Sequence, residues 1–135
     1  MYFLTWYNFI MVLLDSLVLG LRNWKNYKGR ASRSEYWWFT LANFIGVMVW
    51  LAIAALFGSW VLPVAFAWIL IFGLAHCTLI IRRLHDVGRR GWFVWLLLVP
   101  TIGQVLLLWF LVHKGQNWVN KYGPPRPEMR ELVVR

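Results

Sequence analysis

The fold of this chain is decided by residues 37–57, which read WWFTLANFIGVMVWLAIAALF. Two more apolar stretches follow, residues 60–81 (WVLPVAFAWILIFGLAHCTLII) and residues 92–112 (WFVWLLLVPTIGQVLLLWFLV). Each has the length of about 20 residues that a helix needs to cross about 30 Å of hydrocarbon. Of the 135 residues, 61% are hydrophobic and only 14% are charged, whereas soluble domains carry about 25% charged residues. The sequence therefore predicts an all-α integral membrane protein with three membrane-embedded segments.

Aromatic residues mark the ends of these segments. The chain has 11 tryptophans, and tryptophan and tyrosine favour the boundary between lipid and water. The aromatic residues at segment edges are Tyr36, Trp37, Trp38, Trp60, Trp92 and Trp95. We expect one membrane domain over residues 1–127, overlapping a polar tail over residues 116–135.

The N-terminal residues 3–27 predict an amphipathic helix lying in the membrane interface. At 100° per residue, one face carries apolar side chains and the other carries polar ones. The apolar face comprises Phe3, Trp6, Phe9, Ile10, Leu13, Leu14, Leu17, Leu21 and Trp24. Asp15 opposes a crossing, because an acid at mid-span costs about 2.5–3.5 kcal/mol. A fourth spanning helix is the alternative. No basic residue precedes the apolar run and no small-x-small site follows it, so we do not interpret it as a secretory signal.

The segment between the first two predicted helices carries a helix-start pattern. Gly29 can end the first helix, because glycine tolerates the left-handed conformation. Ser32 and Glu35 have the spacing of a capping box, in which the serine hydroxyl accepts from the Glu35 N–H and the carboxylate returns to the Ser32 N–H. We therefore expect a helix to begin near Arg33 and to run into the first apolar segment.

Basic residues predict the orientation, because Lys and Arg near span ends favour the cytoplasmic side. The first flank holds Arg22, Lys25, Lys28, Arg30 and Arg33, and the second holds Arg82, Arg83, Arg89 and Arg90. The turn Gly58-Ser59 between the first two spans holds no basic residue. Both basic regions should be cytoplasmic, and this turn should face the other side.

The third apolar segment conflicts with this rule if it crosses once. A single crossing would place the basic tail residues outside: Lys114, Lys121, Arg126, Arg130 and Arg135. Pro100 and Gly103 interrupt the segment at its middle, where proline removes a backbone donor and glycine permits a turn. We expect a kinked span, and a re-entrant hairpin that returns the tail to the cytoplasm is the alternative.

Three motifs resemble a known family. They are GRASRSEYW at residues 29–37, RRLHDVGRRGW at residues 82–92 and NKYGP at residues 120–124. Their order and spacing, with the break at Pro100 and Gly103, are similar to the bacterial inner-membrane family named for the domain of unknown function 805. This resemblance implies a small helical protein of the bacterial inner membrane, and it implies no activity.

The same motifs hold the best candidate site. Arg side chains bind phosphate oxygens through a planar fork, and basic clusters beside spans attract anionic lipid. The candidate lipid- or phosphate-binding residues are Arg30, Arg33, Arg82, Arg83, Arg89 and Arg90. The candidate polar network at this interface comprises Ser32, Glu35, His85 and Asp86. A loop over residues 84–91 would let His85 and Asp86 face the same way.

The sequence gives less support to other kinds of functional site. Cys77 is the single cysteine, which excludes an internal disulfide and a multi-cysteine metal site. We expect no metal, cofactor or catalytic residue, because no nucleophile has an evident base. No nucleic-acid-reading motif accompanies the net charge of +9. The apolar segments contain polar residues that should bond between helices: Asn43, His76, Thr78 and Gln104. His76 could instead mark an ion path.

The sequence therefore predicts a non-catalytic membrane or envelope interaction module that binds anionic lipid headgroups. One alternative is a channel or transporter subunit, which would need a homo-oligomer because three short spans cannot enclose a pore. The other is a membrane enzyme acting on a lipid-phosphate substrate.

Overall fold

The computed structural model describes residues 2–128, with side chains from residue 6 onward, and in this part it is helical without a strand. The elements in chain order are α1 (Tyr2–Arg22), α2 (Arg33–Phe57), the 3₁₀ helix η1 (Ser59–Val61), α3 (Leu62–Asp86), the 3₁₀ helix η2 (Gly91–Leu98) and α4 (Ile102–Val112). The side chains of Phe3 and Thr5, and the predicted tail residues Arg130 and Arg135, lie outside the described part.

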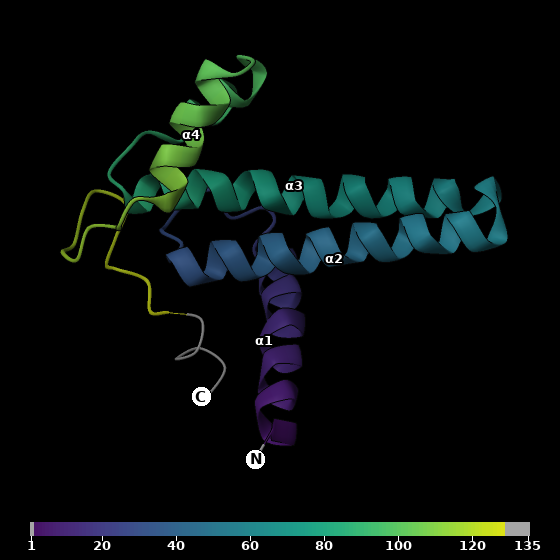
Figure 1. Ribbon diagram of the computed structural model, residues 1–135. Coiled ribbons are helices and arrows are strands. Elements are labelled where there is room, and N and C mark those ends of the chain that lie inside the picture. The colour runs from purple at the N-terminus through teal and green to yellow at the C-terminus, as the bar shows by residue number, and fades with distance from the viewer. Residues whose placement is uncertain (1, 129–135) are drawn as a thin grey trace.

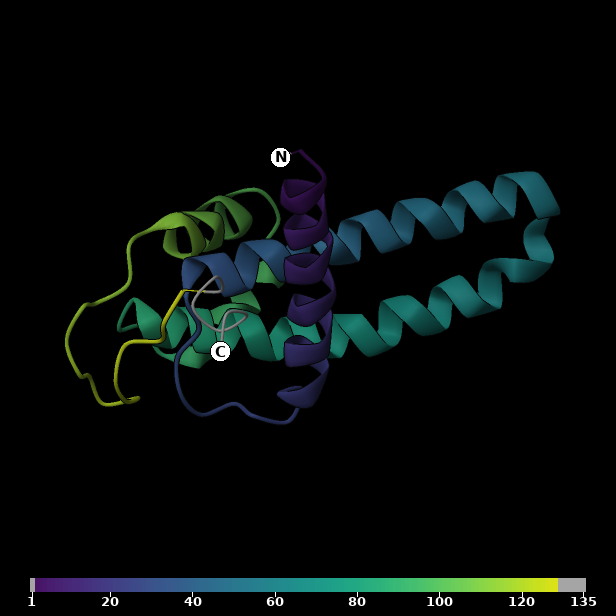
Figure 2. The same cartoon turned by 90° about the horizontal axis from the view of Figure 1, so that it is seen from below.

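Helices α2 and α3 form a long antiparallel pair, which Figures 1 and 2 both show side by side. The turn between them lies at Gly58, as the sequence predicts; its φ is 94°, and its N–H donates to the Ala54 carbonyl at 2.9 Å. Pro63 lies in the first turn of α3, where its missing donor costs little. Both helices are long and apolar enough to cross a membrane.

Most apolar side chains of this pair point outward, which separates them from the core helices of a soluble protein. On α2, Phe44, Val49 and Leu56 are exposed, Leu56 to 79%. On α3, Phe66 and Leu74 are likewise exposed. Soluble monomers rarely expose apolar surface so continuously. The outer face of the pair therefore fits a lipid environment.

Polar residues between α2 and α3 bond across the pair, as predicted for Asn43 and His76. The Trp68 indole N–H donates to Asn43 Oδ1 at 3.0 Å, and Thr40 Oγ1 lies 3.2 Å from His76 Nε2. Gly46 lies directly against the Trp68 ring, where a side chain would collide. Close contact at small residues is the usual way that helices pack in lipid.

Helix α1 runs across the α2–α3 pair (Figures 1 and 2) and contacts both helices. Its buried side comprises Val12, Ser16 and Gly20, spaced four residues apart so that they share one face. Gly20 packs against the Phe39 ring without room for a Cβ. Ser16 is polar and is absent from the predicted apolar face, yet it is buried here, so the predicted division into one apolar and one polar side is only partly right.

The predicted extent of this helix to residue 27 is wrong. Helix α1 ends at Arg22, seven residues before Gly29. Both the backbone and the side-chain N–H of Asn23 donate to the Leu19 carbonyl, at 3.1 and 2.8 Å. Asn23 therefore supplies the hydrogen bonds to a carbonyl of the last turn, and residues 23–32 form a loop.

The third apolar segment doubles back on itself. Phe93 of η2 meets Phe110 of α4 edge to face, with ring centroids 5.8 Å apart. Gly103 lies against the Leu96 carbonyl oxygen, where a Cβ would overlap it. Thr101 has a φ of 60° at the reversal, directly after Pro100. The expected kinked span is therefore wrong, and the hairpin alternative describes the structure. Gln104, expected within the membrane, is exposed on the first turn of α4.

This reversal gathers the basic residues at one end of the molecule. Helix α4 returns to the C-terminal end of α3, where Arg83 Nε donates to the Leu111 carbonyl at 3.2 Å. No Lys or Arg occurs in residues 34–81 or 91–113. Lys114, Lys121 and Arg126 therefore lie at the same end as Arg33, and the charge conflict of a single crossing disappears.

Candidate functional site

A polar junction forms where four segments meet at the C-terminal end of α3. They are the loop before α2, the first turn of α2, the last turns of α3 and residues 113–126 after α4. Helix α3 runs through Asp86, beyond its predicted end at Arg83. Arg82, Arg83, His85 and Asp86 are consequently buried on successive helical positions, and the loop predicted from residue 84 is wrong.

Asp86 is the central anion of the junction. Its Oδ1 accepts from Arg30, whose Nε and Nη2 lie 2.8 and 2.7 Å away, and its Oδ2 accepts from Arg83 Nη1. The three side chains are 7%, 1% and 0% exposed, in the order Asp86, Arg30, Arg83. Buried charges of this kind are tolerated when they are paired and hydrogen-bonded.

Other guanidinium donors bind backbone carbonyls of α4 and of the segment that follows it. Arg30 donates to the carbonyls of Trp118 at 2.8 Å and Gly123 at 3.3 Å, and also to Gln116. Arg83 donates to Leu111 and to the His113 carbonyl just after α4. These two arginines therefore fix the segment after α4 against the end of α3.

Glu35 is the second buried carboxylate, and it is also shared by two arginines. Arg82 Nη2 binds its Oε1, and Arg126 Nε lies 3.5 Å from its Oε2. The predicted capping box is half right, because the Ser32 hydroxyl accepts from the Glu35 N–H at 3.3 Å. The carboxylate does not return to the Ser32 N–H, since charged guanidinium groups are stronger partners than a backbone amide.

His85 and Asp86 face different neighbours, as adjacent helical residues do. His85 Nδ1 lies 3.2 Å from the Gly29 carbonyl oxygen, and its ring stacks on Tyr122 at 3.7 Å with planes 7° apart. Asn120 donates its side-chain amide to the His85 carbonyl at 3.0 Å. The hypothesis that His85 and Asp86 act together in a loop is thus wrong.

The six basic residues predicted to bind lipid divide into two groups. Arg30, Arg82 and Arg83 are buried and bound within the chain. Arg33, Arg89 and Arg90 are exposed, and the Arg89 guanidinium lies over the Phe110 ring at 4.9 Å. The sequence offered no way to separate them, because most partners of the first group are distant along the chain, such as Glu35 for Arg82 and Asp86 for Arg30.

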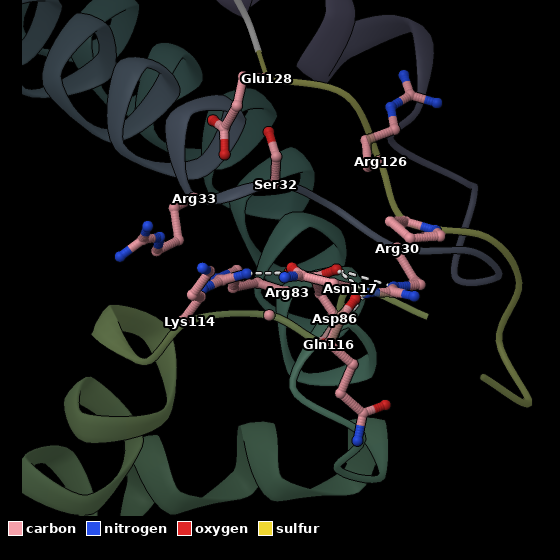
Figure 3. Close-up of a pocket in the computed structure, with 12 residues that line it drawn as sticks. Arg30, Ser32, Arg33, Arg83, Asp86, Lys114, Gln116, Asn117, Arg126 and Glu128 are labelled. Atoms are coloured by element: carbon pink, nitrogen blue, oxygen red, sulfur yellow. Dashed lines mark hydrogen bonds and ion pairs between the residues drawn. The ribbon is translucent and has the colours of Figure 1, made fainter. Parts of the chain in front are cut away.

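A small polar cavity opens beside Asp86 (Figure 3). It has a volume of about 80 Å³. Figure 3 shows Arg33 and Lys114 on one side of the Arg83–Asp86 pair and Arg30 on the other. Five basic side chains line the cavity against two acidic ones: Arg30, Arg33, Arg83, Lys114 and Arg126 against Asp86 and Glu128. Lys114 and Arg126 were not among the predicted site residues, although their basic character was the available signal.

Metal binding has no geometric support in the described residues. No three His, Cys, Asp or Glu side chains come together within residues 2–128. Cys77 is exposed on α3, away from the junction.

The comparison with known proteins covers most of this junction. The family model described as "Protein of unknown function (DUF805)" matches residues 24–124. The inner membrane protein YhaI of Escherichia coli is 38% identical over 103 residues, which cover 76% of this chain and 87% of the relative. The inner membrane protein YhaH of the same organism is 34% identical over 117 residues, covering 82% and 95%. No solved structure matches the chain. The chain therefore belongs to the DUF805 family, as its three motifs indicated, and its relatives are inner membrane proteins.

Proposed function

We propose that this protein is a non-catalytic inner-membrane module that binds anionic lipid headgroups at its basic end. The observation that carries the proposal is the segregation of charge. The apolar hairpin of α2 and α3 carries no Lys or Arg between residues 34 and 81, and exposed basic side chains gather beyond one end of it. Such clusters next to membrane spans attract anionic lipids at about 1 kcal/mol per basic residue.

In the proposed arrangement, α2 and α3 cross the bilayer with the Gly58 turn on the far side. Helix α1 lies in the cytoplasmic interface, and residues 91–112 enter and return as a re-entrant hairpin. Both basic regions and the tail are then cytoplasmic, which satisfies the positive-inside rule. The hairpin's apolar surface supports embedding, since Ile102, Val105 and Trp109 are all exposed.

The proposed lipid contact uses exposed side chains only. The basic ones at this end are Lys25, Lys28, Arg33, Arg89, Arg90, Lys114 and Lys121. Trp24, Trp92 and Trp118 are exposed among them. Indole rings favour the same interfacial depth at which phosphate groups lie. The buried Arg30, Arg82 and Arg83 hold the surface in place and contact no lipid.

The junction supports a structural role more strongly than a catalytic one. Glu35 and Asp86 are each held between two guanidinium groups, so neither is placed to accept a proton from a substrate. The His85 ring is covered by Tyr122. Asn43 and His76 bond within the α2–α3 pair rather than toward a pore.

The test replaces Arg89 and Arg90 with glutamine and measures the phosphatidylglycerol and cardiolipin that co-purify in mild detergent. We expect less anionic lipid per protein, because two exposed charges are lost. The matched control replaces the same residues with lysine, which keeps the charge and should keep the lipid. Unchanged lipid retention in the glutamine variant would contradict the proposal.

A further inference from the structure

The cavity beside Asp86 holds more positive charge than its own acids neutralise. Five basic side chains and two acidic ones line it, which leaves a net charge of +3. Asp86 is already shared by Arg30 and Arg83. Neither Arg33 nor Lys114 forms an ion pair with any described residue.

Arg126 adds a third incompletely paired cation. It lies 3.5 Å from Glu35, a carboxylate already bound by Arg82, and its Nε lacks a hydrogen-bond partner. Two neutral donors also line the cavity, the Ser32 hydroxyl and the Asn117 amide. The donors therefore come from the start of α2, from the segment after α4 and from the tail.

We infer that this cavity binds one phosphate group beside Arg33 and Lys114, with Arg126 adding positive charge from the opposite side. A phosphate presents several charged oxygens and suits donors that come from different directions. Guanidinium groups bind such oxygens in pairs, and an ammonium adds a point charge. The volume of about 80 Å³ has room for a few water molecules, at about 10–15 Å³ each. It therefore has room for one small anion.

The position of the cavity favours a phosphate at headgroup depth. Arg33 is the first residue of α2, and Lys114 follows the end of α4 by two residues. Ser32 is the N-cap of α2, so the positive end of a 25-residue helix faces the same space. The inference rests on the proposed function, and it replaces general attraction with one saturable site. Free inorganic phosphate carries the same chemistry as a lipid phosphate.

A substitution at Glu128 should change phosphate binding in the opposite direction. Its side chain also lines the cavity, and Figure 3 shows its carboxylate close to Ser32 and Arg33. A bound phosphate would be repelled by this carboxylate. Removing its charge should therefore strengthen phosphate binding, whereas removing Lys114 should weaken it.

The experiment measures binding of short-chain phosphatidylglycerol to the full chain in neutral detergent, by titration and by native mass spectrometry. We expect one saturable site in the unmodified chain. Lys114→Gln and Arg33→Gln should each raise the Kd about tenfold, the usual scale for a charge-assisted contact. Glu128→Gln should lower it several-fold. The comparison variant is Lys25→Gln, which removes one exposed charge of the proposed lipid surface beside Trp24, outside the cavity. It should raise the Kd much less than Lys114→Gln and leave the saturable site.

A parallel titration with inorganic phosphate identifies the source of the ligand. Binding of free phosphate that is lost in Lys114→Gln supports the cavity as a site for a soluble anion. Binding of phosphatidylglycerol alone, with the same loss, supports a lipid ligand. All variants lie on exposed side chains, and an unchanged melting temperature confirms that they fold.

Two results would overturn the inference. One is an equal effect of Lys25→Gln and Lys114→Gln, which indicates only general attraction and leaves the proposed function standing. The other is the absence of a saturable site. If Lys114→Gln abolishes binding while the Arg89 and Arg90 variants retain all their lipid, the proposed surface fails and the cavity stands.

Discussion

Asp86→Asn should destabilise the fold although it keeps the size of the side chain. The substitution leaves the guanidinium groups of Arg30 and Arg83 buried without their shared carboxylate. Breaking a buried ion pair from one side costs about 3–5 kcal/mol. Both arginines keep backbone carbonyl partners, Trp118 for Arg30 and Leu111 for Arg83, so we expect the lower value. At about 4 °C per kcal/mol for a chain of this size, a loss of about 3 kcal/mol lowers Tm by about 12 °C.

Thermal unfolding in mild detergent, followed by tryptophan fluorescence, measures this loss. Asp15→Asn is the matched control, because Asp15 is half-buried on α1 and forms no ion pair with a described residue. It should change stability by less than about 0.5 kcal/mol.

The coupling between the paired residues provides a second readout. Adding Arg83→Met to Asp86→Asn removes a cation that has lost its partner, so the double variant should lose less stability than the two single variants together. A fall in Tm of under about 2 °C for Asp86→Asn, which corresponds to about 0.5 kcal/mol, would refute the reasoning. Simple additivity would refute it as well.

Three more predictions follow from the same geometry. Gly115→Ala should cost about 1–3 kcal/mol by overpacking, because its Cβ would overlap the Asp86 carboxylate, whereas Gly73→Ala in open space should be neutral or stabilising in the same melting assay. Tyr122→Ala should cost about 1 kcal/mol by removing the ring stacked on His85, and Tyr122→Phe should keep that stability; equal losses in both would contradict a role for the ring. A reporter fused to the C-terminus should be active only in its cytoplasmic form, since the hairpin returns the tail to the basic end; activity of a periplasmic reporter would instead support a single crossing.

The apolar pattern predicted the α2–α3 pair well, because its determinants are local. The run of residues 37–57 ends with Phe57, and so does α2, since Gly58 follows at once with a positive φ. Ser32 caps the start of α2 as its spacing to Glu35 indicated. These features depend on residues that are near one another in the chain.

The junction could not be predicted, because its partners are distant. Arg82 and Arg83 read as charges that end a span, yet α3 continues through them to Asp86. Arg82 can be buried because it pairs with Glu35, which lies 47 residues earlier. Arg30 binds tail carbonyls as far as Gly123, which lies 93 residues later. No periodicity in the sequence reports such pairings.

The hairpin of residues 91–112 could be predicted only in part. Pro100 and Gly103 located the break correctly, since proline and glycine act on the local backbone. The direction of the chain after the break depends on what binds the last turn of α4. Arg83 binds the carbonyls of Leu111 and His113 and so brings α4 back to α3.

The separation of the junction residues along the chain also sets when it can form during synthesis. Arg30 is made before its carbonyl partners at Gln116, Trp118 and Gly123, which follow it by 86, 88 and 93 residues. Until then the guanidinium groups of Arg30 and Arg83 have only part of their final bonding. A chain truncated before residue 116 would carry the apolar helices without the segment that completes the junction. Such a product would leave the Arg30 guanidinium without three of its carbonyl partners.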